Sequence, residues 1–249
     1  MTGVAGCVAL VTGCGSAGGI GFATAQALAA AGARVAITAG GGRIFDRQAA
    51  LGEGHRGFVA DLCDAEQVRG MVAAVRTRFG GLDIVVTTAE APATEAEALR
   101  IEDMADADWQ AETGQTLTAA FNVTRAVLPG MQVRGFGRIV HVAPVTGALA
   151  GSAGLGAARA ALTGLTRRIA QENAALGITC NAVLPGWIVE PPLPEDGPGR
   201  PGLPQDVAAA CLFLAGRAAG FINGATLVVD GGHGLGGDAL RGGGLHGEG

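Results

Sequence analysis

The chain has 249 residues, of which 49% are hydrophobic and 16% charged, and its net charge is −5. This length fits one α/β domain, and the scattered basic residues offer no patch for nucleic acid or an anionic membrane, so we expect neither partner. The chain starts without a basic or apolar leader, and no apolar run approaches the roughly 20 residues of a membrane span, which predicts a cytoplasmic protein.

Short apolar runs alternate with helical patterns along most of the chain. The pattern predicts strands at 8–12, 34–38, 57–60, 84–87, 138–142, 179–184 and 226–229, and helices at 20–31, 65–79, 109–128, 157–176 and 205–215. Strands that alternate with helices indicate a doubly wound parallel sheet with helices on both faces.

Residues 1–232 are predicted to form this single domain. The segment 233–249 is mostly glycine with few apolar side chains, which predicts a flexible tail. The five cysteines, at positions 7, 14, 63, 180 and 211, share no CxxC spacing. We expect buried free thiols and no metal site.

A glycine-rich turn joins the first strand to the first helix. Glycines there let the backbone approach a pyrophosphate, whose charge the helix N-terminal amides stabilise. The alternative is that the glycines serve only tight turning and packing. The candidate residues in this turn are Thr12, Gly13, Ser16, Gly19, Ile20 and Gly21.

Cofactor choice is expected to depend on the end of the second strand. An acidic side chain there would bind the ribose of NAD, and a basic one the extra phosphate of NADP. The chain has no acid after Thr38, and Arg43 follows three glycines. This favours NADP, unless Arg43 is only a solvated charge that opens the next helical segment.

The chain resembles the short-chain dehydrogenase/reductase family, which has a Rossmann-type fold. The motifs that carry the resemblance cover nearly the whole chain: the glycine turn, Asp61-Leu62, Gly137-Arg138-Ile139-Val140, Asn181 to Ile188 and Val229-Asp230-Gly231-Gly232. The resemblance implies that Asp61 and Leu62 contact adenine. It also implies cofactor contacts at Ala89, Arg159, Pro185 and Gly186.

The family's hydride chemistry uses a tyrosine, a lysine, a serine and an asparagine. The chain contains no tyrosine. Alignment of the motifs places Thr116 at the asparagine, Pro144 at the serine, Leu155 at the tyrosine and Arg159 at the lysine. Leucine cannot donate a proton, so the resemblance predicts no catalytic residue at these positions.

Two further departures from the family concern the binding sites. Glu90 replaces a glycine at the end of the fourth strand, where its bulk and charge are expected to oppose the cofactor phosphates. Glu190 replaces a threonine before a short segment rich in Pro and Gly. NADP binding is therefore expected to be weak or absent.

Candidates for a replacement acid or base are Glu90, Glu112, His141, Thr146 and Glu190. By the strand period of two, His141 faces away from position 144, which indicates a packed structural histidine. The two glutamates at strand ends lie on the expected ligand side, either as catalytic groups or as solvated or interface carboxylates.

Three functions remain open. The favoured hypothesis is a non-catalytic or regulatory subunit that forms a homo- or hetero-oligomer, with an active paralogue as partner, through the family's interface segments at 119–121, 157–162 and 225–229. The alternatives are a non-redox enzyme, such as a cyclase, isomerase or lyase, and an atypical NADP-dependent reductase.

Overall fold

The computed structural model describes residues 3–88, 100–143, 152–189, 200–232 and 234. A seven-stranded parallel sheet with strand order β3-β2-β1-β4-β5-β6-β7 forms its centre. The strands are β1 Val8–Val11, β2 Arg34–Ala39, β3 Arg56–Val59, β4 Ile84–Thr87, β5 Gly137–Val142, β6 Ile178–Pro185 and β7 Thr226–Val229. The predicted doubly wound α/β sheet is confirmed.

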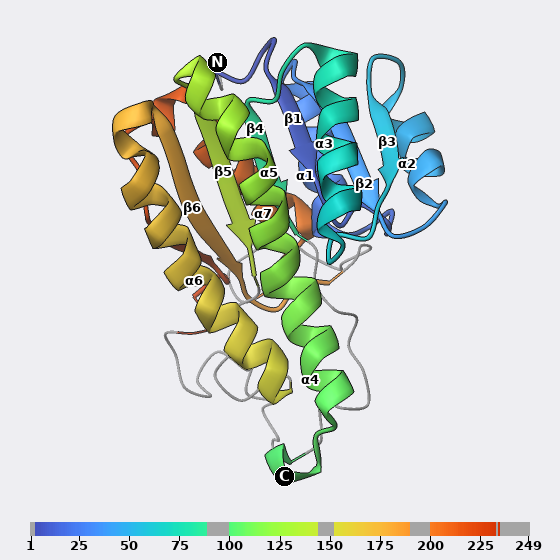
Figure 1. The fold of residues 1–249 in the computed structure, drawn as a ribbon, viewed down its shortest axis with the longest axis vertical. Coiled ribbons are helices and arrows are strands. Elements are labelled where there is room, and N and C mark those ends of the chain that lie inside the picture. The colour runs from blue at the N-terminus through green and yellow to red at the C-terminus, as the bar shows by residue number, and fades with distance from the viewer. Residues whose placement is uncertain (1–2, 89–99, 144–151, 190–199, 233, 235–249) are drawn as a thin grey trace, which may run out of the picture.

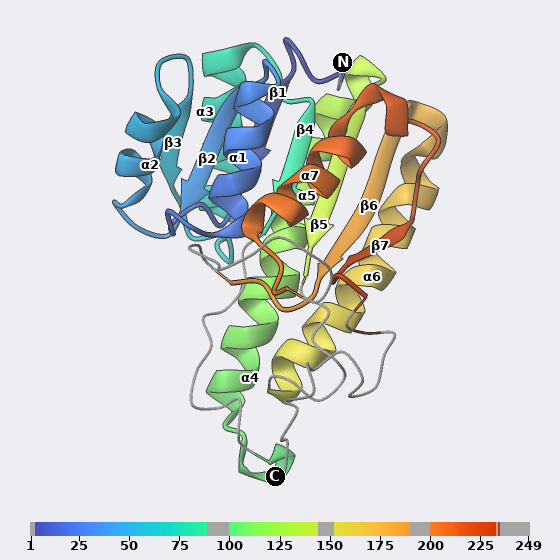
Figure 2. The same cartoon turned by 180° about the vertical axis from the view of Figure 1, so that it is seen from behind.

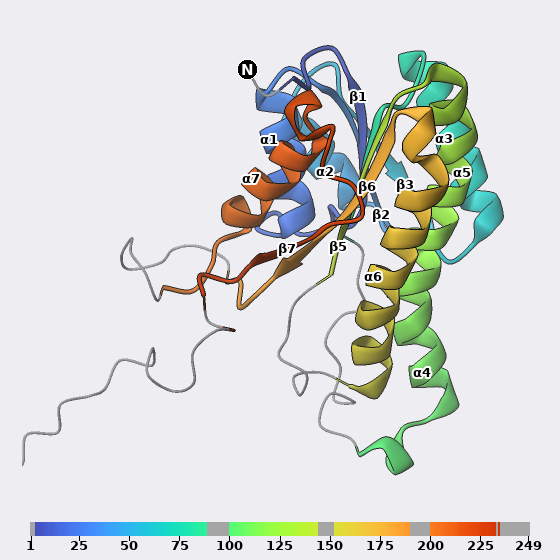
Figure 3. The same ribbon diagram turned by 90° about the vertical axis from the view of Figure 1, so that its left-hand side faces the viewer.

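Helices cover both faces of this sheet (Figures 1 and 2). The α-helices are α1 Ile20–Ala30, α2 Ile44–Leu51, α3 Ala65–Phe79, α4 Asp106–Thr113, α5 Ala119–Arg134, α6 Ala153–Asn173 and α7 Pro204–Ala215. The shorter turns are η2 Ile101–Asp103, the π turn η3 Gly114–Thr118, η4 Ala174–Leu176 and η5 Arg217–Ala219. Helices α1 and α7 lie on one face, and α3, α5 and α6 lie on the other (Figure 3).

Two apolar clusters hold these layers together. One joins α1 and α7 to the sheet through residues such as Leu28 and Leu214, and the other joins α3 and α5 to it through residues such as Val72 and Met131. The central strands β1 and β4 are buried along their full length. Burial on both faces explains why these strands appear in the sequence as continuous apolar runs.

Two predicted helices differ from those observed. The helix predicted over 109–128 is divided by the π turn η3, and α6 begins at Ala153 rather than near residue 157. Ser152 caps α6 by accepting a hydrogen bond from the Leu155 amide. Small residues follow this cap, so apolar periodicity gave no signal for the first turn.

The long helices extend past the carboxyl end of the sheet. Helix α4 and the first half of α6 run side by side beyond the ends of β5 and β6 (Figures 1 and 3). Among the described residues, no helix is both long enough and apolar enough to span a membrane. Ligand sites in such folds lie at this carboxyl end, so the overhanging helices form one wall of the expected site.

Candidate active site

The glycine turn lies at the carboxyl end of β1, directly before α1. Gly13 has a φ of 67°, and a Cβ there would lie 2.6 Å from Thr88 Oγ1. A Cβ on Gly21 would lie 2.6 Å from the Gly13 carbonyl oxygen. Both positions therefore need glycine so that the turn can pack closely. This packing requirement is separate from the cofactor contact that the sequence predicts.

Hydrogen bonds between two threonines join the turn to β4. The Thr88 amide donates to Thr12 Oγ1 over 3.1 Å, and Thr88 Oγ1 donates to the Thr12 carbonyl oxygen over 2.6 Å. Thr12 is fully buried. These bonds fix the ends of β1 and β4 relative to each other.

The N-terminus of α1 points its free amides at this turn. Gly19 is the N-cap, no side chain caps the helix, and the first turn contains no acidic residue. A Cβ on Gly19 would lie 3.2 Å from the Ser16 Cβ, so the turn is compact. Unpaired helix N-terminal amides are suited to bind a phosphate anion.

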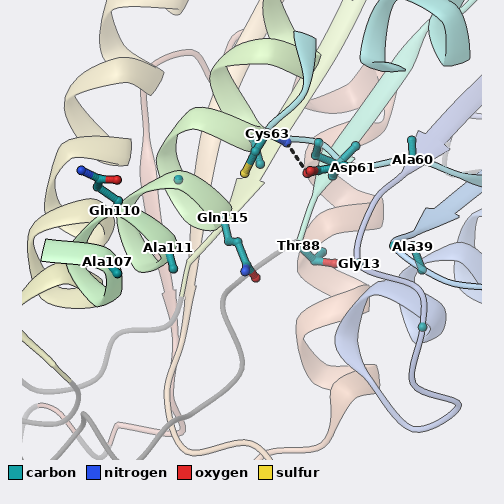
Figure 4. Close-up of a pocket in the computed structure, with 15 residues that line it drawn as sticks. Gly13, Ala39, Ala60, Asp61, Cys63, Thr88, Ala107, Gln110, Ala111 and Gln115 are labelled. Atoms are coloured by element: carbon teal, nitrogen blue, oxygen red, sulfur yellow. Dashed lines mark hydrogen bonds between the residues drawn. The ribbon is translucent and has the colours of Figure 1, made fainter. Parts of the chain in front are cut away.

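A cavity of about 910 Å³ opens in front of the turn (Figure 4). Its lining residues come from the ends of β1, β2, β3 and β4 and from the α4–η3 region: Gly13, Gly15, Ala39, Gly40, Ala60, Asp61, Leu62, Cys63, Thr88, Ala107, Gln110, Ala111, Gly114, Gln115 and Ala119. This volume is in the range of small-molecule and cofactor sites.

The segment after β3 forms one side of this cavity. Asp61 Oδ1 accepts a hydrogen bond from the Cys63 amide over 2.9 Å, and the buried Leu62 lies between them. The sequence resemblance placed the adenine contacts at Asp61 and Leu62, and the structure brings both to the cavity. Cys63 is exposed there, which corrects the expectation that all five cysteines are buried; the other four are buried.

Arg43 lies at the N-cap of α2, where its side chain is exposed. It follows the segment Ala39–Gly40, which lines the cavity without an acidic group. Arg43 therefore does open a helical segment, as one of the two sequence interpretations stated. Arg43 itself is not among the residues that line the cavity.

Thr116 lies in the π turn between α4 and α5. Its side chain is 3% exposed, and its hydroxyl has no hydrogen-bond partner among the described residues. π turns inside helices frequently mark functional sites. The resemblance placed the family's asparagine here, and the structure supplies at this position an unpaired hydroxyl within a distorted helix.

The predicted tyrosine and lysine positions both lie on α6. Leu155 is buried at 2% exposure and Arg159 is half-buried. Glu112, which the sequence analysis named as a candidate acid or base, is also buried, and it accepts a hydrogen bond from Ser152 Oγ. Sequence analysis missed Ser152. A small polar residue three positions before Leu155 at a helix start was the only available signal.

His141 is fully buried in β5 and lies 2.8 Å from Thr87 Oγ1 through its Nδ1. Burial lowers the pKa of His141 from 6.5 to about 4. The imidazole therefore stays neutral near neutral pH, which suits the packed structural histidine that the strand period predicted.

Gly186 follows the last residue of β6, Pro185, and its amide donates to the Val229 carbonyl over 3.0 Å. A Cβ on Gly186 would lie 2.5 Å from the Asp230 Cβ. The two motifs at the ends of β6 and β7 thus pack directly against each other. This contact gives Gly186 a structural role beside the predicted cofactor contact.

Several predicted site residues lie outside the described residues: Ala89, Glu90, Pro144, Thr146 and Glu190. The predicted tail at 233–249 lies outside them as well, except for Gly234. Among the described residues, no group of three or more His, Cys, Asp or Glu is placed to hold a metal ion.

Comparison with known proteins identifies the class that this fold and site define. Residues 13–234 match the family model described as enoyl-(acyl carrier protein) reductase. The chain belongs to the short-chain dehydrogenase/reductase family.

Curated relatives match the chain over almost their whole length. It is 35% identical over 245 residues to the 3-oxoacyl-[acyl-carrier-protein] reductase FabG of Vibrio cholerae, covering 91% of this chain and 97% of the relative. It is 37% identical over 243 residues to the acetoacetyl-CoA reductase of Rhizobium meliloti, covering 90% and 97%. It is 33% identical over 263 residues to the D-beta-hydroxybutyrate dehydrogenase of Cupriavidus necator, covering 91% and 97%.

These relatives overturn the hypothesis of a non-catalytic or regulatory subunit. Proteins 33–37% identical over nine-tenths of the chain are named as reductases and a dehydrogenase. The hypothesis took the replacement of the family's asparagine, serine, tyrosine and lysine, by Thr116, Pro144, Leu155 and Arg159, as a loss of activity. Proton transfer requires a positioned acid or base, and carboxyl groups, hydroxyl groups and water chains also meet that requirement.

Proposed function

We propose that this chain is a nicotinamide-dependent reductase that converts a short 3-oxoacyl thioester into the 3-hydroxyacyl thioester. The cavity at the carboxyl end of the sheet supports this proposal, because it joins the glycine turn and the uncapped N-terminus of α1 to a wall formed by α4 and η3. The names of the relatives support the substrate class, since two of them reduce a 3-oxoacyl or acetoacetyl thioester by name.

In this proposal, residues of the cavity and of the neighbouring helices α1, α2 and α6 hold a dinucleotide. The α1 amides after Gly19 would hold the pyrophosphate, Asp61 and Leu62 the adenine, and Arg159 the nicotinamide ribose. Arg43 would hold the phosphate that distinguishes NADP from NAD, since no acidic residue follows β2. When bound, the reduced nicotinamide supplies the hydride.

The proton must come from a group other than tyrosine, because the chain has none. Leu155 occupies the tyrosine position in our alignment and cannot donate. Protic groups do lie in the same region, at Glu112, Ser152 and Thr116. The reductase we propose therefore uses the family's fold and cofactor with a different proton donor.

Gly15 allows a test of cofactor binding and turnover together. It lines the cavity, and a Cβ at this position would make only an ordinary 3.5 Å contact with the Ala39 Cβ. Gly15→Asp should therefore fold while its carboxylate repels the pyrophosphate, and Gly15→Ala controls for added bulk.

The measurements are calorimetric titration with NADPH and NADH and the rate of acetoacetyl-CoA reduction. The wild type is expected to bind and turn over. Gly15→Asp should lose at least tenfold in nucleotide affinity, and Gly15→Ala much less. A wild type that binds neither nucleotide, or equal affinities for Gly15→Asp and Gly15→Ala, would overturn the proposed cofactor site.

A further inference from the structure

A second cavity lies at the amino end of the sheet, away from the candidate active site. Its volume is about 360 Å³, and its lining includes Cys7, Asp83 and Phe136. These residues directly precede β1, β4 and β5, at the end of the sheet opposite α4 (Figure 1). Cys7 is six residues before Gly13 of the first cavity, which corresponds to roughly 20 Å at about 3.3 Å per strand residue. The second cavity is large enough for a small molecule.

The charges that line this cavity are not balanced. Asp83 is the one carboxylate among the described residues of the lining, and Arg134 and Arg217 are its two arginines. Both carboxylate oxygens of Asp83 are engaged: Oδ2 accepts from the Val8 amide over 2.9 Å, and Oδ1 lies 3.3 Å from Arg134 Nε. No ion pair in the described part of the chain includes Arg217. Arg134 thus compensates Asp83, and the charge of Arg217 is left without a carboxylate.

An aromatic ring holds the Arg217 side chain in place. Arg217 is the first residue of η5, and its guanidinium carbon lies 4.6 Å from the centroid of the Phe136 ring. This distance is within the range of a cation–π contact. A guanidinium stacked on a ring keeps its N–H donors in its own plane, so they can still bind an oxyanion at its edge.

A third guanidinium adds to the positive charge behind the cavity. Arg138 is 6% exposed, and its guanidinium carbon lies 4.5 Å from the centroid of the same Phe136 ring. It donates to the carbonyl oxygens of Gly137 and Gly177 over 2.8 and 3.2 Å, and no ion pair among the described residues includes it. Burial, and next the charge of Arg217, lower the pKa of Arg138. The two like charges therefore oppose each other across a short distance, which an anion would relieve.

We propose that this cavity binds a small molecule that carries a phosphate or carboxylate group, and that Arg217 contacts the anionic group. The planar fork of an arginine matches the oxygens of either group, and charge-assisted hydrogen bonds are the strongest of their kind. The volume limits the ligand to a small molecule. The site is independent of the proposed function, because its described lining shares no residue with the first cavity.

Three variants separate a specific site from general charge effects. Arg217→Gln removes the charge of an exposed side chain and should fold. Arg217→Lys keeps the charge without the planar fork. Arg167→Gln is the matched control, because Arg167 is an exposed arginine of α6 that does not line the cavity and belongs to none of the ion pairs among the described residues.

The experiment titrates the full-length chain, labelled with ¹⁵N-arginine, with inorganic phosphate and separately with acetate. Sodium chloride keeps the ionic strength constant. The arginine Nε–Hε resonances are followed by NMR, and the resonance of Arg217 is identified by its absence from the Arg217→Gln spectrum. We expect a saturable shift of that resonance with phosphate, acetate or both. A shift with phosphate alone would support the site and limit its ligands to phosphate groups.

Melting temperatures supply a second readout. Phosphate also stabilises proteins through exclusion from their surface, and this contribution should be the same in every variant. The apparent affinity for phosphate should fall at least fivefold in Arg217→Gln, fall less in Arg217→Lys and stay unchanged in Arg167→Gln. Equal phosphate stabilisation of the wild type and Arg217→Gln would overturn the inference. So would the absence of a saturable Arg217 shift with either anion, including a case in which only Arg43 responds. Neither readout depends on nucleotide binding or turnover.

Discussion

His141 Nδ1 and Thr87 Oγ1 lie 2.8 Å apart at paired positions of β5 and β4, in the buried centre of the sheet. The other ring nitrogen of His141 has no partner among the described residues. A protonated imidazole would place a second N–H donor there, and no described residue offers it an acceptor. The buried contact between Thr87 and His141 therefore favours the neutral imidazole. As a result, the free energy of unfolding depends on pH.

Burial lowers the pKa of His141 from 6.5 to about 4. Above pH 6.5 the ring is neutral in both the folded and unfolded chains, and its titration does not alter stability. Between pH 6.5 and about 4 the unfolded chain binds a proton that the folded chain does not. The free energy of unfolding should therefore decrease as the pH falls, by about 3 kcal/mol over the whole window.

Urea unfolding at several pH values checks this prediction, with His141→Gln as the variant. The variant should lose most of the pH dependence in this window. His55 is the matched control: its pKa is also lowered by burial, but the residue is less buried, so His55→Gln should keep the steep part of the curve. Parallel curves for the wild type and His141→Gln would contradict the prediction.

Gly186 is predicted to tolerate no side chain. Gly186→Ala would bring a methyl group to 2.5 Å from Asp230 Cβ and 2.8 Å from its Cα, so the ends of β6 and β7 would have to separate. We expect a loss of about 1–3 kcal/mol in the free energy of unfolding. The control is Gly70→Ala on the exposed face of α3, where nothing lies within 4 Å and stability should rise slightly. Equal stability of the two variants would refute the proposed contact.

Arg43 is predicted to select NADPH over NADH. Arg43→Ala should weaken NADPH binding by about tenfold, because one charge-assisted interaction with the extra phosphate is lost, and should leave NADH binding unchanged. Arg56→Ala is the control, since Arg56 is the first residue of β3 and lies at the amino end of the strands, whereas Arg43 follows the carboxyl end of β2. Calorimetric titration of both nucleotides measures the effect, and an equal loss for NADPH and NADH would argue against this role.

Assembly remains a proposal, with exposed apolar side chains on α5 and β7 as its basis. Phe121 is 42% exposed, and Leu227 and Val228 are 37% and 49% exposed. Phe121→Glu should keep α5 folded, because a glutamate four residues before Arg125 forms a favourable helical pair. We expect light scattering to show a lower mass than for the wild type. Val133→Glu at the exposed end of α5 should not change the mass, and a monomeric wild type would contradict the proposal.

The sheet could be predicted from sequence because its order depends on local patterns. The runs at Ile84–Thr87 and Thr226–Val229 matched the observed strands residue for residue, and the helix Ala65–Phe79 did as well. Helix α3 has an Asp64 cap and a Gly80 in the left-handed conformation, which are strong start and stop signals.

The site was less predictable because tertiary contacts form it. Glu112 and Ser152 are 40 residues apart in the sequence, and no local pattern indicates that they meet. The π turn at Thr116 has the same apolar pattern as a continuous helix, so periodicity predicted no interruption. The resemblance placed the family's tyrosine at Leu155, which is buried. No family motif marked Ser152, one helical turn earlier.

Transfer of a labelled hydride tests the central claim most directly. NADPH that carries deuterium at the transferable C4 position is incubated with acetoacetyl-CoA and the purified wild-type chain, and the product is analysed by mass spectrometry. Our account predicts 3-hydroxybutyryl-CoA with one deuterium at C3, formed in proportion to NADPH oxidised, and a strong reduction in product for Gly15→Asp. Absence of deuterated product from a folded, NADPH-bound wild-type chain, across 3-oxoacyl thioesters of several chain lengths, would contradict it.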